Sequence, residues 1–278
     1  MKRSIIVLMT VLTLMLAFTA PTTAVTNGAP DGDDHPYIGL LVFDIFVPDE
    51  GNVPAWRCSG SLISETVVLT AGHCTDGAVA ARVWFDERLQ DDDGSFLVPD
   101  YPGGGVAAIE GTPFTNPDFA IGAGKGLPGF AFRDVGVVVL DGSVDVGSFA
   151  TLPTTGLVDD QPNKTDLDLV GYGSQEQFHI PGEGAPFWTG LRNRLFAPAD
   201  LVSGNFVHGD EFVKVTANPG GGTGGICFGD SGGPILLAGT DTILAVNSYV
   251  TNGNCTGVTY SSRVDIAAVL DWIGSFLQ

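Results

Sequence analysis

The sequence GDSGGP occupies positions 229–234 and embeds one serine, Ser231, among three glycines. A serine hydroxyl attacks a carbonyl carbon only if a base takes its proton and if hydrogen-bond donors stabilise the resulting oxyanion. Glycines let the backbone approach a substrate closely, and the amides of Gly229 and Ser231 can supply two such donors. A purely structural glycine-rich turn gives no reason for the Asp-Ser pair inside it. The string therefore predicts a nucleophilic serine with its own oxyanion hole.

Two further strings contain the residue types that such a serine needs. TAGHC at positions 70–74 places His73 beside a cysteine, and DVGVVVL at positions 134–140 places Asp134 at the head of a predicted buried strand. A histidine can take the serine proton, and a carboxylate can orient the imidazole and stabilise its protonated form. The other histidines have no comparable neighbours: His35, His179 and His208. We therefore predict that His73, Asp134 and Ser231 act together.

The order of these residues along the chain separates the known classes of serine hydrolase. The spacing Gly229-x-Ser231-x-Gly233 also fits the nucleophile elbow of the α/β-hydrolases, in which the histidine follows the serine. No histidine occurs after Ser231, so that class is excluded. Counting alone allows the subtilisin order of Asp, His and Ser, because Asp44 precedes His73. The flanking strings, and the lack of alternating strands and helices, speak against it.

The order His73, Asp134, Ser231, with these flanking strings, resembles that of the chymotrypsin-like (trypsin-fold) serine peptidases. The resemblance extends through nearly all of the chain after residue 24. Further matching stretches are VTNG at 25–28, PY at 36–37 with the β-run after it, CSGSLI at 58–63, SYV at 248–250 and WI at 272–273. Three features depart from the family: a long stretch between His73 and Asp134, only two of the recurrent disulfides, and Val250 where glycine is usual.

The resemblance implies an all-β fold of two antiparallel six-stranded β-barrels, with a C-terminal helix and a boundary between the barrels near residue 155. The active site would lie in the cleft between them. The family's roles would make His73 the general base and then the general acid, with Asp134 orienting it. Ser231 would form the acyl-enzyme, and the amides of Gly229 and Ser231 would form the oxyanion hole.

The resemblance also implies a set of substrate-binding residues: Gly225, Ile226, Ser248, Tyr249, Val250 and Gly257. A substrate would add as an extra strand beside residues 248–250. Gly225, six residues before Ser231, would lie at the base of the primary pocket, where an acid would select arginine or lysine. Ile226 would add apolar surface, and Gly257 would line the opposite wall. Because Gly225 is uncharged and Val250 narrows the entrance, we predict cleavage after uncharged apolar residues, small or medium aliphatics rather than large aromatics.

Activation is predicted from the same resemblance. A new N-terminal ammonium at Val25 would fold inward and pair with Asp230, the acid directly before the nucleophile, and thereby order the oxyanion hole. Since Val25 directly follows the expected signal cleavage after Ala24, signal removal itself would create this amine. Cleavage after Ala20, which would leave a four-residue propeptide, is the alternative.

The first 24 residues have the layout of a secretory signal rather than of folded structure. Lys2 and Arg3 are basic, and Ile5–Phe18 is an apolar run of 14 residues, followed by small residues up to Ala24. Such a run is short for a membrane span but suits a cleavable signal. The alternative is an uncleaved membrane anchor. We therefore expect residues 1–24 to be a signal peptide and residues 25–278 to form a secreted peptidase domain.

Four cysteines become informative if the chain is exported: Cys58, Cys74, Cys227 and Cys255. Four cysteines allow three pairings, and the simplest in an oxidising compartment joins nearest neighbours, 58 with 74 and 227 with 255. A zinc site is the alternative interpretation of these cysteines. It lacks CxxC spacing and an HExxH helix, so disulfides are favoured and no metal is expected at these residues.

Composition and charge limit the classes of partner. The chain has 278 residues, 44% of them hydrophobic and 16% charged, with 39 glycines, which suits a turn-rich β-protein. Its formal charge is −20 and becomes −22 without Lys2 and Arg3. Such a surface repels phosphate backbones, so nucleic-acid binding is excluded as the main function, and strongly acidic substrates are disfavoured. We expect protein or peptide substrates, protein inhibitors as further partners, no membrane contact after signal removal, and a monomer.

Short strands and one helix must position these residues. Strands are predicted at Tyr37–Val47, as two strands around a polar bend within Cys58–Thr70, at Gly136–Leu140, and as a hairpin over Ile235–Val250 with its turn near Gly239–Asp241. The composition of Glu87–Gly129 indicates long surface loops. Ala268, Leu270, Ile273 and Leu277 recur at helical intervals and predict an amphipathic helix over Val264–Leu277.

Two alternatives stay open beside this interpretation. Asp91, Asp92 and Asp93 could join Asp86 or Glu87 in holding a structural calcium ion, although the absence of EF-hand spacing favours a solvated acidic loop and no cofactor. A catalytically inactive member of the same fold, acting as a binding or scaffold protein, is the alternative function. The presence of all three residues of the predicted triad favours an active serine endopeptidase.

Overall fold

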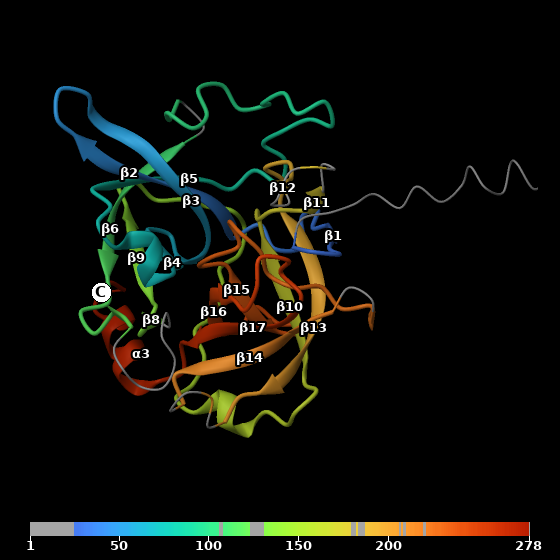
Figure 1. Cartoon of the computed structure of the whole chain (residues 1–278). Coiled ribbons are helices and arrows are strands. Elements are labelled where there is room, and N and C mark those ends of the chain that lie inside the picture. The colour runs from blue at the N-terminus through green and yellow to red at the C-terminus, as the bar shows by residue number, and fades with distance from the viewer. Residues whose placement is uncertain are drawn as a thin grey trace, which may run out of the picture.

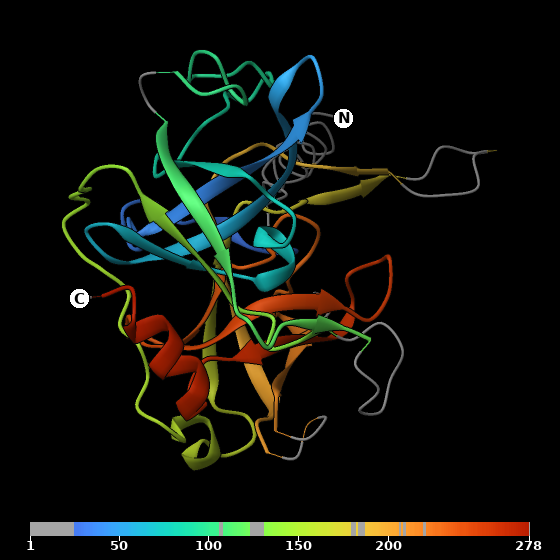
Figure 2. The ribbon, with the colours of Figure 1, turned by 90° about the vertical axis from the view of Figure 1, so that its left-hand side faces the viewer.

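The computed structural model of the chain describes residues 25–105, 108–122, 131–178, 182, 187–205, 207, 210–218 and 221–277. The predicted signal peptide, residues 1–24, lies outside this set. Among the described residues, no helix is both long enough and apolar enough to cross a membrane. The described chain forms two β-barrels that lie against one another, with a short helix near the C-terminus (Figures 1 and 2).

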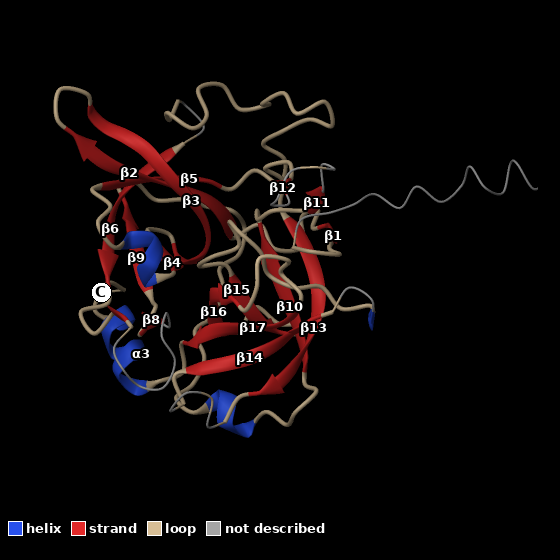
Figure 3. Ribbon diagram, viewed as in Figure 1, coloured by secondary structure: helices blue, strands red, loops and turns tan. Residues whose placement is uncertain are grey.

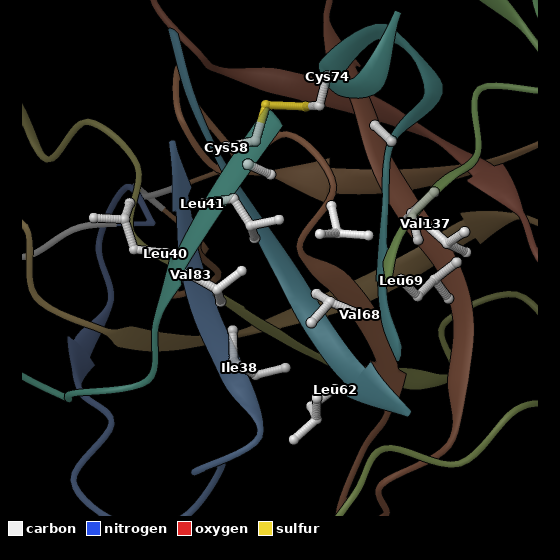
Figure 4. Packing of buried hydrophobic residues seen from close by; sticks show 14 of the residues in the cluster. Ile38, Leu40, Leu41, Cys58, Leu62, Val68, Leu69, Cys74, Val83 and Val137 are labelled. Carbon is white, nitrogen blue, oxygen red and sulfur yellow. A yellow bond between two sulfur atoms is a disulfide. The ribbon is translucent and has the colours of Figure 1, made fainter. Parts of the chain in front are cut away.

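The first barrel is closed by six antiparallel strands in the order β2-β3-β4-β9-β6-β5. These are β2 (Ile38–Val47), β3 (Gly51–Ser64), β4 (Val67–Thr70), β5 (Ala80–Trp84), β6 (Ile109–Thr115) and β9 (Gly136–Leu140). Leucine, isoleucine and valine from facing strands fill its interior, with the Cys58–Cys74 bridge at one end of the cluster (Figure 4). Each fully buried side chain of this kind stabilises the fold by about 1.5–3 kcal/mol.

The second barrel also contains six antiparallel strands. They are β10 (Asp166–Gly171), β13 (Leu195–Ser203), β14 (Phe212–Ala217), β15 (Pro234–Leu237), β16 (Ile243–Val250) and β17 (Gly257–Arg263). Their order is β13-β10-β15-β16-β17-β14, and β14 pairs back onto β13, which closes the barrel. The short β1 (Ala29–Pro30) adds to β13 from outside the ring. The predicted fold class is confirmed, and strands dominate the described chain (Figure 3).

The remaining elements are short. They are α2 (Gly72–Thr75), the 3-10 helix η1 (Leu157–Asp160), α3 (Ala267–Gly274), and the two-stranded pairs β7 (Ala120–Ile121) with β8 (Ala131–Phe132) and β11 (Glu176–Phe178) with β12 (Phe187–Thr189). The connection between the two barrels runs from residue 141 to residue 165 and contains η1. Only α2 among these elements carries a residue of the predicted triad.

Most strands lie where the sequence predicts them. The run at Tyr37–Val47 forms β2, the two strands around a polar bend form β3 and β4, and Gly136–Leu140 is β9. β15 and β16 form the hairpin predicted over Ile235–Val250, with its turn between them. Strong β-formers bounded by turn residues identify these segments without tertiary information.

The prediction of surface loops throughout Glu87–Gly129 is wrong, because β6 lies in this stretch and joins β5 to β9. Gly111 and Pro113 obscure the strand pattern of β6. Gly111 serves close packing, since a Cβ atom there would lie 2.7 Å from the carbonyl oxygen of Val139. A strand that needs glycine for contact with its neighbour carries little local signal.

The C-terminal helix exists, but its extent and its buried face differ from the prediction. It spans Ala267–Gly274, and its buried residues are Val269 and Ile273. Ala268 is exposed, and Leu277, beyond the helix, is 39% exposed. Val269 and Ile273 are four residues apart and lie on one face of the helix, so they form its buried stripe; of the residues predicted for that face, Ile273 is buried in the core.

A buried arginine joins the N-terminal segment to both barrels. Arg194, directly before β13, donates from Nε to Oδ2 of Asp31 at 2.7 Å and from Nη2 to the carbonyl of Gly32 at 2.8 Å. Its Nη1 donates to the carbonyls of Phe85 (3.0 Å) and Ile38 (3.2 Å) in the first barrel. Arg194 is only 1% exposed, so these acceptors replace the water that its charge would otherwise require.

Candidate active site

Asp134 and His73 meet at the end of the first barrel. β4 pairs with β9 up to Thr70 and Gly136, which places α2, after β4, beside the residues before β9. Oδ1 of Asp134 accepts from the backbone N–H of His73 at 2.7 Å, and Oδ2 lies 2.8 Å from Nδ1 of its imidazole. The Asp134 side chain is fully buried, whereas that of His73 is 31% exposed. One carboxylate therefore fixes both the backbone and the ring of the histidine.

A third donor to Asp134 comes from the second barrel. Ser248, on β16, is 8% exposed, and its Oγ lies 2.5 Å from Oδ2 of Asp134. Sequence reasoning assigns Ser248 to substrate binding and misses this contact. No pattern in the string Ser248-Tyr249-Val250 indicates it, because it depends on how the barrels meet. Asp134 thus connects the two barrels at the site.

The electrostatics of this pair favour a protonated histidine. Burial lowers the pKa of His73, but the charge of Asp134 and its hydrogen bond raise it by more, so the net shift is upward. The carboxylate of Asp134 occupies Nδ1 of the imidazole. Nε2 is therefore the nitrogen that can accept and release a proton. This is the behaviour expected of a general base.

The loop that carries Ser231 is held against both barrels. The N–H of Ser59, on β3, donates to the carbonyl of Ser231 at 2.8 Å. The N–H of Gly232 donates to the carbonyl of Asn247 on β16, also at 2.8 Å. Gly232 has φ +78°, and a Cβ atom there would lie 2.7 Å from the backbone N of Ala71. Ser231 is therefore packed against the residues that lead into His73.

The backbone around Ser231 leaves two amides unpaired. Gly229 has φ +99°, a conformation that favours glycine. Among the hydrogen bonds of the described residues, neither the N–H of Gly229 nor that of Ser231 has an acceptor. Ser59 fixes the loop further, because its Oγ donates to the carbonyl of Gly229 at 3.0 Å. The two amides are available to an incoming anion, and Ser59 is a positioning residue that sequence reasoning missed.

Asp230 is a buried carboxylate that forms no ion pair among the described residues. It is 0% exposed, and it accepts from the N–H groups of Gly173 (2.8 Å) and Cys227 (2.9 Å). Burial raises its pKa to about 7, against the lowering effects of these bonds and of the more distant Arg57. Val25 is fully buried, and Thr26 exchanges backbone hydrogen bonds with Gly225 at 2.8 and 3.2 Å. The N-terminal segment is thus docked in the second barrel, near the loop of Ser231.

The predicted specificity residues fall into two groups. Gly225 and Ile226 are buried, with Ile226 in the core of the second barrel. A Cβ atom on Gly225 would lie 2.5 Å from that of Ala217, so uncharged groups surround it. Gly257 is exposed, and nothing lies within 4 Å of an added Cβ. The strand neighbour of Val250 on β17 is instead Thr259, which is fully buried and which sequence reasoning missed.

Both nearest-neighbour disulfides are present. Cys58 is bonded to Cys74 and joins β3 to α2, and Cys227 is bonded to Cys255 near the loop of Ser231. In the described chain, Cys58, His73 and Cys74 are the one group of three potential metal donors. Its two sulfurs are bonded to each other, which removes them as thiolate ligands.

The other residues considered as ligands or bases lie elsewhere. Nη2 of Arg88 contacts Asp91 and Asp92, each at 3.0 Å, and Asp93 accepts from the N–H of Ser95. Local partners thus surround the acidic loop, and calcium binding there stays a prediction. His35 pairs with Asp31 at 2.6 Å and stacks on Phe196, away from the triad. His179 and His208 lie outside the described residues.

Comparison with known proteins agrees with this geometry. The model of the Trypsin family matches residues 42–273. The bovine Proproteinase E is 27% identical and aligns over 92% of this chain and 96% of its own. Chymotrypsin-like elastase family member 3B of Macaca mulatta is 26% identical, over 78% of this chain and 80% of its own. The solved structure of HL collagenase superposes with a TM-score of 0.65 at 20% identity, covering 90% of this chain and 97% of the collagenase.

We predict that replacing Asp134 lowers the pKa of His73. In Asp134→Asn, the charge that raises this pKa is removed while burial, which lowers it, remains. NMR titration of the His73 ring should therefore place its midpoint at a lower pH than in the unmodified chain. The exposed Asp145→Asn, with the same change in net charge, should leave the midpoint in place. An unchanged midpoint in Asp134→Asn would contradict the interpretation of this pair.

Proposed function

Because the chain belongs to the trypsin family, we propose that it is a secreted serine endopeptidase that cleaves peptide bonds through an acyl-enzyme. The observation that carries the proposal is the pairing of His73 with a fully buried Asp134 beside a serine loop that presents two unpaired amides. A glycine-rich serine loop alone has many structural uses. Because this loop packs against the residues that lead into the Asp134–His73 pair, we infer that it has a catalytic role.

The proposed reaction proceeds in two halves. His73 takes the proton of the Ser231 hydroxyl as its oxygen attacks the scissile carbonyl, and the amides of Gly229 and Ser231 stabilise the oxyanion. His73 then donates that proton to the leaving amine, the C–N bond breaks, and the acyl group stays on Ser231. A water molecule, deprotonated by His73, hydrolyses the ester and restores the serine. Each oxyanion donor lowers the barrier by about 3–4 kcal/mol.

Secretion is supported by the signal-like first 24 residues and by two disulfides, which persist in oxidising compartments. Proteins and peptides are the proposed substrates. The competing function, an inactive scaffold of the same fold, predicts no covalent intermediate. The two functions therefore differ in a single measurable step.

An active-site titration separates them. We expect mixing with excess p-nitrophenyl ester to release a burst of about one nitrophenol per chain, followed by slow turnover, because acylation outpaces hydrolysis of the acyl-enzyme. Ser231→Ala should show no burst, while the matched control Ser275→Ala, an exposed serine after α3, should keep it. Equal and burst-free hydrolysis by the wild type and Ser231→Ala would favour the scaffold function.

The specificity proposal rests on the surroundings of Gly225. Gly225 contacts Ala217 and Thr26, and Thr259 and Val250 are paired neighbours on the same face of the sheet. A pocket wide enough for a large aromatic side chain would need residues smaller than Thr259 and Val250. A pocket for a basic side chain would need a carboxylate near Gly225. We propose that the enzyme cleaves after small or medium aliphatic residues. A pocket of this kind discriminates modestly, since one methylene is worth about 1–3 kcal/mol.

Peptide anilides that differ only in the residue before the scissile bond test this preference. Alanine, valine and leucine should be hydrolysed about tenfold or more faster than phenylalanine, and arginine should be slowest because its charge would be buried unpaired. Thr259→Gly should raise the phenylalanine-to-alanine ratio of kcat/KM, whereas the exposed Thr256→Gly should not. A preference for arginine would overturn the proposal.

Activation is proposed to follow directly from signal removal. Asp230 accepts two backbone N–H groups and forms no ion pair among the described residues, and burial raises its pKa, so its ionised form would gain from a close cation. An ammonium at Val25, whose neighbour Thr26 is already docked on Gly225, would supply that cation. The pair would stabilise the loop that presents the oxyanion amides.

We predict that active secreted enzyme begins at Val25 and that a Met-Gly extension on Val25 lowers kcat/KM about a hundredfold or more, since an unpaired buried carboxylate costs several kcal/mol. N-terminal sequencing and assay of the two forms check this. Asp230→Asn in the mature form should also reduce activity, while Asp145→Asn serves as the charge control. Full activity with the extension, or an active enzyme that begins at Pro21, would contradict the prediction.

A further inference from the structure

An arginine of the first barrel lies against the proposed oxyanion hole. Arg57, on β3, is half-buried, and its Nη1 donates to the carbonyl of Tyr172 at 2.6 Å. A Cβ atom on Gly229 would lie 2.7 Å from Cζ of Arg57 and 3.0 Å from Nη2. The guanidinium therefore covers the Cα of Gly229, one of the two residues with an unpaired amide. Its position is set by the strand that also carries Cys58.

A second arginine lies close enough to influence the first. Burial and, to a smaller extent, the charge of Arg192 lower the pKa of Arg57 to about 10, against partial compensation from Tyr101 and Asp230. Arg57 remains a cation at neutral pH. Nη1 of Arg192 donates to the carbonyl of Gly190 at 2.8 Å, and its Nε is buried without a hydrogen bond among the described residues. Arg192 thus lies near enough to Arg57 for the two charges to interact, and Arg57 itself lies beside Gly229.

Among the described residues, neither arginine forms an ion pair with a carboxylate, although the more distant Asp230 partly compensates the charge of Arg57. The other described arginines each form an ion pair with a carboxylate: Arg82, Arg88, Arg133, Arg194 and Arg263. In the described part of the chain, Arg57 and Arg192 form none. The chain has 32 acidic residues against 12 basic ones, so carboxylates are abundant. Two neighbouring cations without one leave a local site for an external anion.

The position of Arg57 indicates which part of a substrate it meets. Gly225 and Thr259, proposed to face the acyl part, belong to the second barrel. His73 would protonate the leaving amine, and its helix α2 is bonded to β3 through Cys58–Cys74. On this assignment the leaving segment lies on the His73 side of the site, along β3, which carries Arg57. Residues C-terminal to the scissile bond would lie there.

A pocket adjoins Arg57 on this side. It has a volume of about 220 Å³ and is lined by Val42, Pro54, Ala55, Trp56, Arg57, Tyr101 and Pro102. Nε1 of Trp56 donates to the carbonyl of Cys74 at 2.8 Å, which ties this pocket to α2. Its wall is apolar except at Arg57. A side chain with an apolar stem and an anionic end, such as that of glutamate, fits this combination.

We propose that Arg57 and Arg192 select substrates with an acidic residue among the first three positions after the scissile bond. This inference deepens the proposed peptidase function and rests on it. A carboxylate in the leaving segment would form an ion pair with these arginines. The overall charge of −20 still repels acid-rich chains, so the favoured substrate has an isolated acid at this place.

Internally quenched peptides with one acyl part test the proposal. Each peptide carries glutamate, glutamine or lysine at one of the three positions after the scissile bond. A p-nitroanilide with the same acyl part has no leaving peptide and serves as the reference substrate. At the best position, kcat/KM should be about tenfold higher for glutamate than for glutamine, equal to about 1.4 kcal/mol, and lowest for lysine. The preference should shrink at 0.5 M NaCl, because salt screens partly exposed charges.

Variants assign the preference to residues. Arg57→Gln should reduce the glutamate-to-glutamine ratio to about two or less, as a residual from Arg192, and Arg57→Lys should keep most of it. Arg192→Gln should reduce the ratio partly. Lys164→Gln removes an equal charge from an exposed side chain in the loop before β10 and should keep the ratio. If Arg57→Gln does not fold, Arg192→Gln and the salt series on the wild type decide.

The outcomes separate this inference from the proposed function. Hydrolysis of the anilide with a glutamate-to-glutamine ratio near one would overturn the inference and leave the peptidase function intact. An equal loss on all substrates in Arg57→Gln, with the ratio unchanged, would also overturn it and assign Arg57 to the oxyanion hole instead. Absence of anilide hydrolysis and of the nitrophenyl burst would overturn both.

Discussion

The buried carboxylate of Asp134 is the constraint on which the rest of the site depends. A fully buried charge is tolerated only with several hydrogen-bond donors, and here they come from the backbone and ring of His73 and from the hydroxyl of Ser248. These donors belong to different barrels, so the carboxylate is satisfied only when the barrels are docked in one arrangement. The arrangement that satisfies Asp134 also brings β3 to the loop of Ser231, where the N–H of Ser59 donates to the carbonyl of Ser231. Folding and assembly of the site are thus one event.

The few basic residues of this acidic chain divide into two uses. Arg194 and Arg263 are nearly fully buried and neutralise buried carboxylates, which adds specificity to the packing of loops between strands. Arg57 lies instead beside the serine loop, with Arg192 near it, and neither forms an ion pair among the described residues. The chain has 12 basic residues against 32 acidic ones. Two neighbouring arginines near the site are therefore a local concentration of positive charge in an acidic protein.

The sequence allowed prediction of the parts whose chemistry is local. The strings around His73, Asp134 and Ser231, the disulfide pairing and the strongly apolar strands are legible because each requires particular residue types at fixed spacing. β6 was hidden because Gly111 serves contact with a neighbouring strand rather than strand propensity. Ser59 and Arg57 could not be assigned for a related reason. Their roles arise from segments more than a hundred residues away, such as Gly229 and Tyr172, and nothing in a short window records that proximity.

Arg194 determines how the chain can be divided in evolution. Its guanidinium stands at the start of β13 in the second barrel, yet its counter-charge is Asp31 in the N-terminal segment and two of its acceptors are carbonyls of the first barrel. A second half inherited alone would leave Arg194 without its counter-charge Asp31 and without its carbonyl acceptors in the first barrel. The two barrels have equal numbers of strands and look like interchangeable modules, but recombination between relatives would have to transfer Asp31 and Arg194 together. The smallest heritable unit of this fold is therefore the pair of barrels with the segment that ties them.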